Sequence, residues 1–239
     1  MTDEVHARRR VAFGAGADAY ELGRPGYPEA AIRAALPAGA RRVLDLGAGT
    51  GKLTRDLLAL GLEVVAVEPL EEMRARIPGA ARVLAGSAEE IPLASGSVDA
   101  VLAGQAFHWF DRARALPEIR RVLREGGGLG LMWNLLDDSV GWVAAVAAAF
   151  AAEDRATLPE GDEPAFGRAD GFTAEQRLRI PYVQELDADG LVANVASRSP
   201  LLLMEPGERD AILARVRELA PPGRFELPYV CAVRHGVRT

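Results

Sequence analysis

The chain contains very little cysteine, histidine and lysine. Cys231 is its one cysteine, which excludes a disulfide within the chain. Its three histidines are too scattered to suggest zinc ligands, and we expect no metal site. Lys52 is the single lysine among 28 basic side chains, against 34 acidic ones. The resulting net charge of −6 argues against a nucleic-acid substrate held by general electrostatics.

Long apolar runs are also missing. No stretch reaches the ~18 residues that a transmembrane helix requires, and the N-terminal MTDEVHARRR lacks the apolar segment of a signal peptide. We therefore expect a cytoplasmic protein with no membrane partner. At 239 residues and 49% hydrophobic composition, the chain is long enough for one sizeable α/β core. We expect a single domain over residues 1–239; its oligomeric state is open.

A glycine-rich turn lies between a predicted strand and a predicted helix in RRVLDLGAGTGKLTRD, residues 41–56. The apolar run that ends near Asp45 lacks period-two alternation, which is typical of a parallel strand buried on both faces. Gly47, Gly49 and Gly51 allow the backbone to turn sharply and to approach a ligand without an intervening Cβ. We expect this ligand to lie over the N-terminus of the following helix.

The glycine spacing distinguishes between classes of ligand. A phosphate-binding P-loop needs G-x-x-x-x-G-K-[ST], but Leu46 occupies the first glycine position and Leu53 follows Lys52. A dinucleotide fingerprint needs G-x-G-x-x-G, and Lys52 stands where its third glycine would be. The turn therefore favours a nucleoside without a pyrophosphate. The alternative is a turn that only joins strand to helix.

An acid ends the next predicted strand, Glu63 to Val67. Ligands of open parallel sheets bind beyond the carboxyl ends of the strands, so we expect Glu68 to accept hydrogen bonds from both hydroxyls of a ribose. The alternative is a solvated carboxylate at a strand end. Pro69 ends the strand, and Met73 belongs either to the core or to an apolar floor under the base.

Further strands and helices alternate along the chain, which predicts a doubly wound parallel sheet of the α/β class. We expect strands at 82–85, 98–103, 129–133, 178–183 and 225–234, helices at 111–125, 139–152 and 209–219, and a loop or flexible cover at 153–175. Gly126, Gly127 and Gly128 are expected to end the helix at 111–125. Pro181 and Pro228 imply edge or bulge positions in the last two strands.

Five segments in this order resemble the class I S-adenosylmethionine-dependent methyltransferases: DLGAGTGKLT, VVAVEPLEEM, VLAGSAEEIPLASGSVDAV, AGQAFHWFD and EIRRVLREGGGLGLMWN. The small-molecule branch with trans-aconitate methyltransferases and ubiquinone/menaquinone C-methyltransferases is the most similar. The resemblance covers residues 41–134, and residues 13–28 resemble the N-terminal segment of that group. It implies a seven-stranded, mostly parallel Rossmann-like sheet with an N-terminal helical lid. The lid would span 1–34, a cofactor-binding core 35–136, and an acceptor-side insert with the sheet-closing part 137–239.

The resemblance also implies which residues contact the cofactor, S-adenosylmethionine, or its product S-adenosylhomocysteine. The adenine would lie at Ser87, Ala88 and Glu89, where Ser87 replaces an acid of the family, although Glu89 could instead be a charge at a helix N-terminus. Gln105 and Ala106 would lie on the methionine and ribose side, and Asp45 and Pro69 are also expected among the cofactor-binding residues. In the lid, Tyr20 and Arg24 would hold the methionine carboxylate.

Aromatic side chains are expected around the methyl acceptor. Tyr27, His108, Trp109, Trp133 and Asn134 are the candidates, since aromatic walls exclude water and favour a cationic sulfonium. With an ordinary pKa of about 6.5, His108 could act as a general base, or it could only order its loop by hydrogen bonding. Tyr20 and Tyr27 could likewise only pack the lid.

Three functions remain open. The first is methyl transfer by direct displacement to a small-molecule acceptor, such as an organic acid, a natural-product intermediate or a peptide. The second is a non-catalytic S-adenosylmethionine-binding protein. The third, an NAD-dependent oxidoreductase, is disfavoured by the glycine spacing. The sequence does not distinguish O-, N- and C-methylation.

Overall fold

The computed structural model describes residues 23–150, 165–202 and 204–239, which divide into two compact units. The sheet unit contains the described residues of 26–134, 165–180 and 231–239. The helical unit contains those of 23–25, 135–150, 181–202 and 204–230. Each unit is described by itself below.

Seven strands form one sheet in the order β3-β2-β1-β4-β5-β7-β6. The first four are short: β1 (Arg42–Leu46), β2 (Glu63–Val67), β3 (Arg82–Leu84) and β4 (Val98–Gly104). β1 pairs in parallel with both β2 and β4, and its last four residues are buried. This burial on both faces explains why the sequence lacks alternation there. The predicted doubly wound α/β architecture is confirmed.

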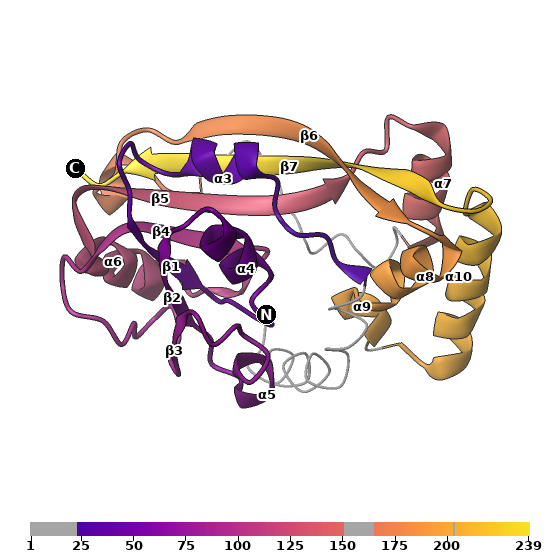
Figure 1. Cartoon of the computed structure of the whole chain (residues 1–239), viewed down its shortest axis with the longest axis horizontal. Helices are drawn as coiled ribbons and strands as arrows, with labels where there is room; N and C mark the ends of the chain where they lie inside the picture. Colours follow the sequence, from indigo (N-terminus) through magenta and orange to yellow (C-terminus); the bar gives the residue numbers. More distant parts are fainter. Residues whose placement is uncertain (1–22, 151–164, 203) are drawn as a thin grey trace. The chain divides into compact units, whose positions relative to one another are not determined.

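The last three strands are longer and continue through residues of both units: β5 (Leu123–Leu136), β6 (Gln176–Leu186) and β7 (Phe225–Val237). β5 pairs in parallel with β4, and the arrowheads in Figure 1 show β7 running opposite to β5 and β6. Pro181 lies on the edge strand β6, as expected. Pro228 lies on the inner strand β7, so an edge position is wrong for it.

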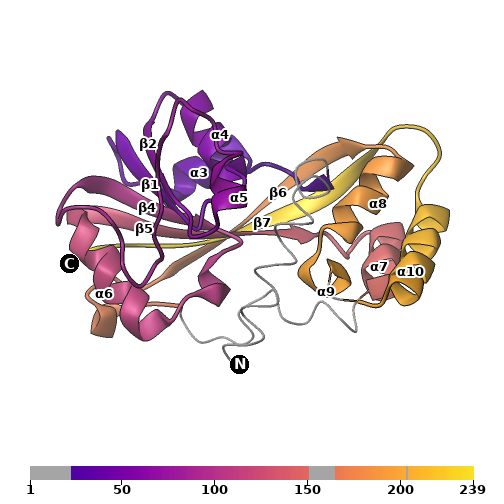
Figure 2. The same cartoon turned by 90° about the horizontal axis from the view of Figure 1, so that it is seen from below.

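Helices cover both sides of the sheet within the sheet unit. α3 (Glu29–Ala35), α4 (Lys52–Ala59) and α5 (Glu71–Arg74) lie on one side, and α6 (Arg112–Val122) lies on the other (Figure 2). Gly130 of β5 makes the close approach of α3 possible, because a Cβ there would lie 2.8 Å from the Cβ of Ala35. α4 begins at Lys52, directly after Gly51 of the glycine turn.

The predicted boundary between α6 and the following strand is wrong. The helix was expected to extend to Glu125 and to end at the three glycines, whereas it ends at Val122 and β5 begins at Leu123. Leu123 already pairs with Val98 of β4, and the register shifts before Gly128 pairs with Ala100. Backbone hydrogen bonding to β4 therefore overrides the local helical pattern.

The helical unit has its own apolar core. Its helices are α7 (Gly141–Phe150), α8 (Ala188–Ala196), α9 (Ser199–Leu202) and α10 (Pro206–Leu219). The 3-10 turn η2 (Arg168–Asp170) belongs to the sheet unit instead. Val146, Leu191, Val216 and Tyr229 are among the buried residues of this core. α7 and α10 were predicted, whereas α8 and α9 were not. No helix in the described ranges is both long and apolar enough to cross a membrane.

Candidate functional site

The glycine turn joins β1 to α4 in a left-handed backbone conformation. Gly47, Gly49 and Gly51 have φ values of 73°, 56° and 84°, which L side chains rarely adopt. A Cβ on Gly47 would lie 2.8 Å from the Cβ of Ala106, so the turn passes close to the segment after β4. A Cβ on Gly49 would meet no atom within 4 Å. Gly49 is therefore the point of the turn where a ligand can approach the backbone.

Glu68 links the end of β2 to this turn. Its Oε2 accepts a hydrogen bond from the Gly49 N–H at 2.9 Å, and its Oε1 accepts one from the Leu70 N–H at 3.0 Å. The residue is 6% exposed, so the interpretation as a solvated carboxylate is wrong. Burial raises the pKa of Glu68 above its ordinary value. Each carboxylate oxygen keeps a second lone pair, which allows hydrogen bonds from two ribose hydroxyls as well.

Asp45 lies in the core beneath the turn. Its Oδ2 accepts a hydrogen bond from Thr54 Oγ1 of α4 at 2.6 Å, and the residue is 1% exposed. Burial raises the pKa of Asp45 to about 7. Thr50, within the turn, is fully buried, and its Oγ1 has no hydrogen-bond partner among the described residues. Asp45 therefore supports the turn from below, and the Thr50 hydroxyl is enclosed within the turn.

The residues expected around the adenine lie at the ends of β2 and β3. Met73 of α5 is buried, whereas Pro69 is exposed and its carbonyl accepts a hydrogen bond from Arg74. Ser87 is half-buried and Ala88 is buried.

Glu89 lies at the N-terminus of α6. Its Oε1 accepts a hydrogen bond from the backbone N–H of Asp111, the N-cap residue of that helix, at 2.9 Å. This position corresponds to the alternative interpretation of Glu89 as a charge at a helix N-terminus. Contact of Glu89 with adenine stays a prediction.

Gln105 follows β4 in a strained conformation. With φ at 54°, it is the one non-glycine residue of the described chain that has a positive φ. Its N–H donates to the Met132 carbonyl at 2.9 Å, and its Nε2 donates to the Asn134 carbonyl at 3.0 Å. Such a backbone costs on the order of 1–3 kcal/mol and persists only where the surroundings fix it. Hydrogen bonds to β5 fix it here.

Asn134 has its side-chain amide fixed in one orientation. Its Nδ2 donates to the Gly26 carbonyl at 3.0 Å, so Oδ1 must point the other way. The residue is 7% exposed, and Oδ1 has no donor among the residues that the structure describes. A buried acceptor without a donor costs about 1–3 kcal/mol. Asn134 is therefore suited to bind a ligand through an N–H or O–H group.

Tyr27 packs against the end of β4. A Cβ on Gly104 would lie 2.4 Å from the Tyr27 hydroxyl oxygen, so any residue larger than glycine at position 104 would collide with the Tyr27 ring. The Tyr27 N–H donates to Asp56 Oδ2 of α4 at 2.6 Å. Packing is thus one role of Tyr27, and contact with the acceptor stays a prediction. Asp56 was missed in the sequence because it looks like an ordinary charge on a helix.

The aromatic segment after Gln105 forms a 3-10 turn, η1 (Phe107–Trp109). The His108 and Trp109 rings lie 4.8 Å apart between centroids, and both residues are half-buried. Phe107 and Phe110 pack edge to face at 5.7 Å. This ring packing is compatible with either role of His108, as a general base or as a residue that orders its loop.

Two predicted cofactor residues are not among the described residues of the sheet unit. Arg24 belongs to the helical unit, where its Nε donates to Ser197 Oγ at 2.9 Å. Tyr20 lies outside the described residues, as does most of the predicted lid. Their contact with a methionine carboxylate stays a prediction.

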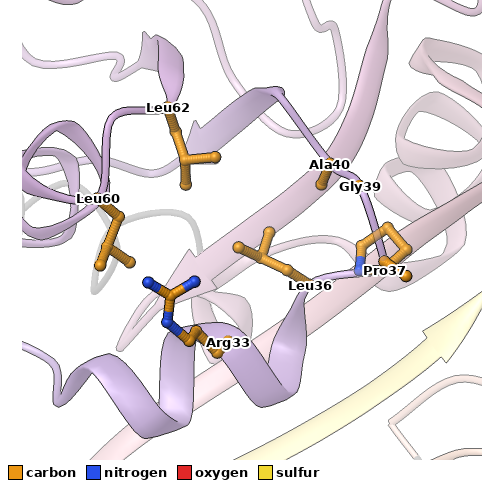
Figure 3. A pocket seen from close by; sticks show the side chains of 8 residues that line it. Arg33, Leu36, Pro37, Gly39, Ala40, Leu60 and Leu62 are labelled. Carbon is orange, nitrogen blue, oxygen red and sulfur yellow. The ribbon is translucent and has the colours of Figure 1, made fainter.

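A surface pocket of about 220 Å³ lies at the opposite, amino end of β1 and β2 (Figure 3). It is lined by the end of α3, the segment before β1 and the turn between α4 and β2, including Leu36, Pro37 and Leu62. Its one charged side chain, Arg33, forms an ion pair with Glu29 at 2.6 Å. It is distinct from the edge that carries the glycine turn and Glu68.

Comparisons with known proteins agree with the geometry at the carboxyl edge. Residues 44–131 match the model of the methyltransferase domain family. An uncharacterized methyltransferase of Mycobacterium tuberculosis is 47% identical over 236 residues, which cover 92% of this chain and 93% of that protein. The chain therefore belongs to the S-adenosylmethionine-dependent methyltransferase family.

Solved structures show the same fold. A structure assigned to a type II methyltransferase of Anaeromyxobacter dehalogenans has a TM-score of 0.65 at 24% identity, over 90% of this chain and 97% of that one. Phosphoethanolamine N-methyltransferase 2 of Haemonchus contortus, solved with S-adenosylhomocysteine, has a TM-score of 0.58 at 15% identity. That match covers 94% of this chain and 57% of the Haemonchus chain.

The residues at the carboxyl edge fit this cofactor. The open space at Gly49 admits a ligand to the backbone, and the free lone pairs of Glu68 suit ribose hydroxyls. S-adenosylmethionine contains such hydroxyls and has no pyrophosphate, which agrees with the glycine spacing.

Proposed function

We propose that the protein transfers the methyl group of S-adenosylmethionine to a small organic acceptor by direct displacement. The proposed acceptors are natural-product intermediates, organic acids and small peptides, by analogy with the branch that contains trans-aconitate and ubiquinone/menaquinone C-methyltransferases. One observation carries the proposal. The cofactor-side residues Gly49, Glu68 and Gln105 and the acceptor-side residue Asn134 lie at or near the carboxyl ends of neighbouring strands.

The cofactor side of the site binds and orients S-adenosylmethionine. S-adenosylmethionine supplies an electrophilic methyl group on a positively charged sulfur. Glu68 accepts hydrogen bonds from the ribose, and the backbone at Gly49 lies against it. Gln105 and Ala106 line the methionine side, where the strained backbone of Gln105 is held by β5. Strain held in this way pre-organises the carbonyl and N–H groups of the segment for binding.

The acceptor side excludes water and aligns the nucleophile. Displacement at a methyl group requires the attacking atom in line at about 3–3.5 Å. Trp109 and the other aromatic rings of η1 provide a low-dielectric wall whose faces also favour a cation. His108 accepts the proton when the nucleophile is a hydroxyl or an amine, and a carboxylate nucleophile needs no base.

The test uses S-adenosylmethionine with a labelled methyl group. The protein is incubated with it and with a fraction of small molecules from a bacterial extract, and label in the small-molecule fraction is the expected result. Binding of S-adenosylhomocysteine is measured separately by calorimetry. Tight binding with no label in any fraction would favour the non-catalytic binding protein, and no binding would refute the cofactor assignment.

A further inference from the structure

Trp133 carries a buried hydrogen-bond donor that no described residue satisfies. The residue is 1% exposed, and its indole Nε1 has no acceptor among the residues that the structure describes. An indole N–H can only donate, and burying it without an acceptor costs about 1–3 kcal/mol. Trp133 directly follows Met132, whose carbonyl binds the N–H of Gln105. The orphan donor therefore belongs to the strand segment next to the proposed acceptor rim.

A guanidinium lies over the same indole ring. The Cζ of Arg234 on β7 is 5.8 Å from the Trp133 ring centroid, and the Arg234 side chain is 13% exposed. Arg234 also forms a long ion pair of 3.5 Å with Glu175. Glu175 accepts shorter hydrogen bonds, at 2.7 Å each, from Arg177 Nε and the Ala165 N–H. The carboxylate of Glu175 is thus shared, and its shorter contacts are to groups other than Arg234.

The surroundings of this pair are positively charged. Burial lowers the pKa of Arg234, and the nearby guanidiniums of Arg177 and Arg112 lower it further against the opposing effect of Glu175. Arg112 also reaches the acceptor rim, because its Cζ is 6.0 Å from the Phe107 ring centroid. A buried N–H donor and a guanidinium in a positive field are complementary to an oxyanion and repel a cation.

We propose that Trp133 and Arg234 form an anion-binding subsite, and that the methyl acceptor carries a carboxylate held by the Trp133 N–H and the Arg234 guanidinium. The proposal rests on the proposed methyltransferase function. The carboxylate acts as a handle that orients the acceptor, and the attacked atom can be a different one. The same chemistry could come from the carboxylate at the methionine end of the cofactor, so the test separates the two sources.

The test uses the full chain saturated with S-adenosylhomocysteine and titrated with matched probes. Phenylacetate, cinnamate and succinate are compared with their carboxamides by calorimetry. We expect at least one carboxylate to bind ten or more times more tightly than its amide. Trp133→Phe, which removes the N–H and leaves a smaller ring at this buried position, and Arg234→Gln should each reduce that preference at least fivefold. Arg179→Gln, at an exposed position of β6, is the matched control and should keep it.

Three results would overturn the proposal. First, the parent protein could bind none of the carboxylates or could prefer the amides. This result needs no variant, so it would count against the proposal even if a variant does not fold. The folded variants could keep the full preference for carboxylates. Finally, both variants could lose affinity for S-adenosylhomocysteine while binding methylthioadenosine, which lacks the amino acid, as the parent does. That pattern would assign the subsite to the cofactor instead.

Discussion

Replacing Glu68 by alanine should weaken cofactor binding strongly and fold stability moderately. The variant loses the proposed acceptor of two ribose hydroxyls, and a hydrogen bond to a charged group contributes about 1.5–3 kcal/mol. Because water fills part of the space, we expect a net loss of about 1.5–3 kcal/mol, or ten- to hundredfold in the Kd of S-adenosylhomocysteine. The backbone N–H groups of Gly49 and Leu70 also lose their acceptor, which should lower the free energy of unfolding by about 1–3 kcal/mol.

The two losses are measured separately. Calorimetry gives the affinity, and urea denaturation without ligand gives the stability. Glu72→Ala is the matched control, since Glu72 is an exposed acid on α5 a few residues further along, and both quantities should stay at the parent values. Glu68→Gln keeps one acceptor oxygen and should fall between the parent and Glu68→Ala.

A modified ligand tests whether Glu68 contacts the ribose directly. S-adenosylhomocysteine that lacks the 2′-hydroxyl should bind the parent more weakly than the normal ligand does. If Glu68 accepts that hydroxyl, the difference between the two ligands should shrink in Glu68→Ala, as in a double-mutant cycle. Unchanged affinity of Glu68→Ala for the normal ligand, with a normal unfolding curve, would refute the ribose contact.

Three more predictions concern the same edge of the sheet. Burial raises the pKa of Asp45 to about 7 from 3.8, so between about pH 4 and pH 7 the folded chain retains a proton that the unfolded chain loses. The free energy of unfolding should therefore fall as the pH rises through this range. Urea denaturation at pH 5 and pH 8 should show a smaller difference for Asp45→Asn than for the parent. If His108 takes the proton in methyl transfer, His108→Gln should reduce turnover by about 10² or more with unchanged cofactor affinity, and near-parent turnover would remove it from the catalytic residues. Gly104→Ala should lower the free energy of unfolding by about 1–3 kcal/mol, since its Cβ would lie 2.4 Å from the Tyr27 hydroxyl oxygen. Gly79→Ala is the control and should leave the stability unchanged, because a Cβ there would meet no atom within 4 Å. Equal denaturation midpoints of the two variants would contradict the packing of Tyr27 on β4.

The sequence predicted the strands that are buried on both faces best. β2 was expected at Glu63 to Val67 and has these bounds in the structure, because a short, continuous apolar run between turn residues is typical of a buried strand. The end of α6 was predicted wrongly, since the pairing of Leu123 with Val98 involves a strand distant in sequence. α8 was missed although Asp187 caps it by accepting from the Gly190 N–H, a local signal that was present in the sequence.

The candidate site likewise has one part that could be predicted from the sequence and one part that could not. The glycine turn and Glu68 belong to one strand-turn-helix-strand segment, so their relation could be predicted from spacing. The bond of Asn134 to Gly26 and the strain of Gln105 depend on contacts between distant segments, which no local pattern contains. The grouping of Trp133 with Arg234 has the same origin, because their strands are neighbours only in the folded sheet.

The single lysine has a practical consequence for measuring ligand binding. Lys52 is the first residue of α4, directly after the glycine turn, so it offers amine-reactive reagents one side chain close to the proposed cofactor position. Attachment to a sensor surface through the Lys52 amine, in place of the α-amino group, would couple the protein beside that position and lower the apparent affinity. Conversely, slower acylation of Lys52 when S-adenosylhomocysteine is present, followed by mass spectrometry, would report occupancy of the turn without any engineered label.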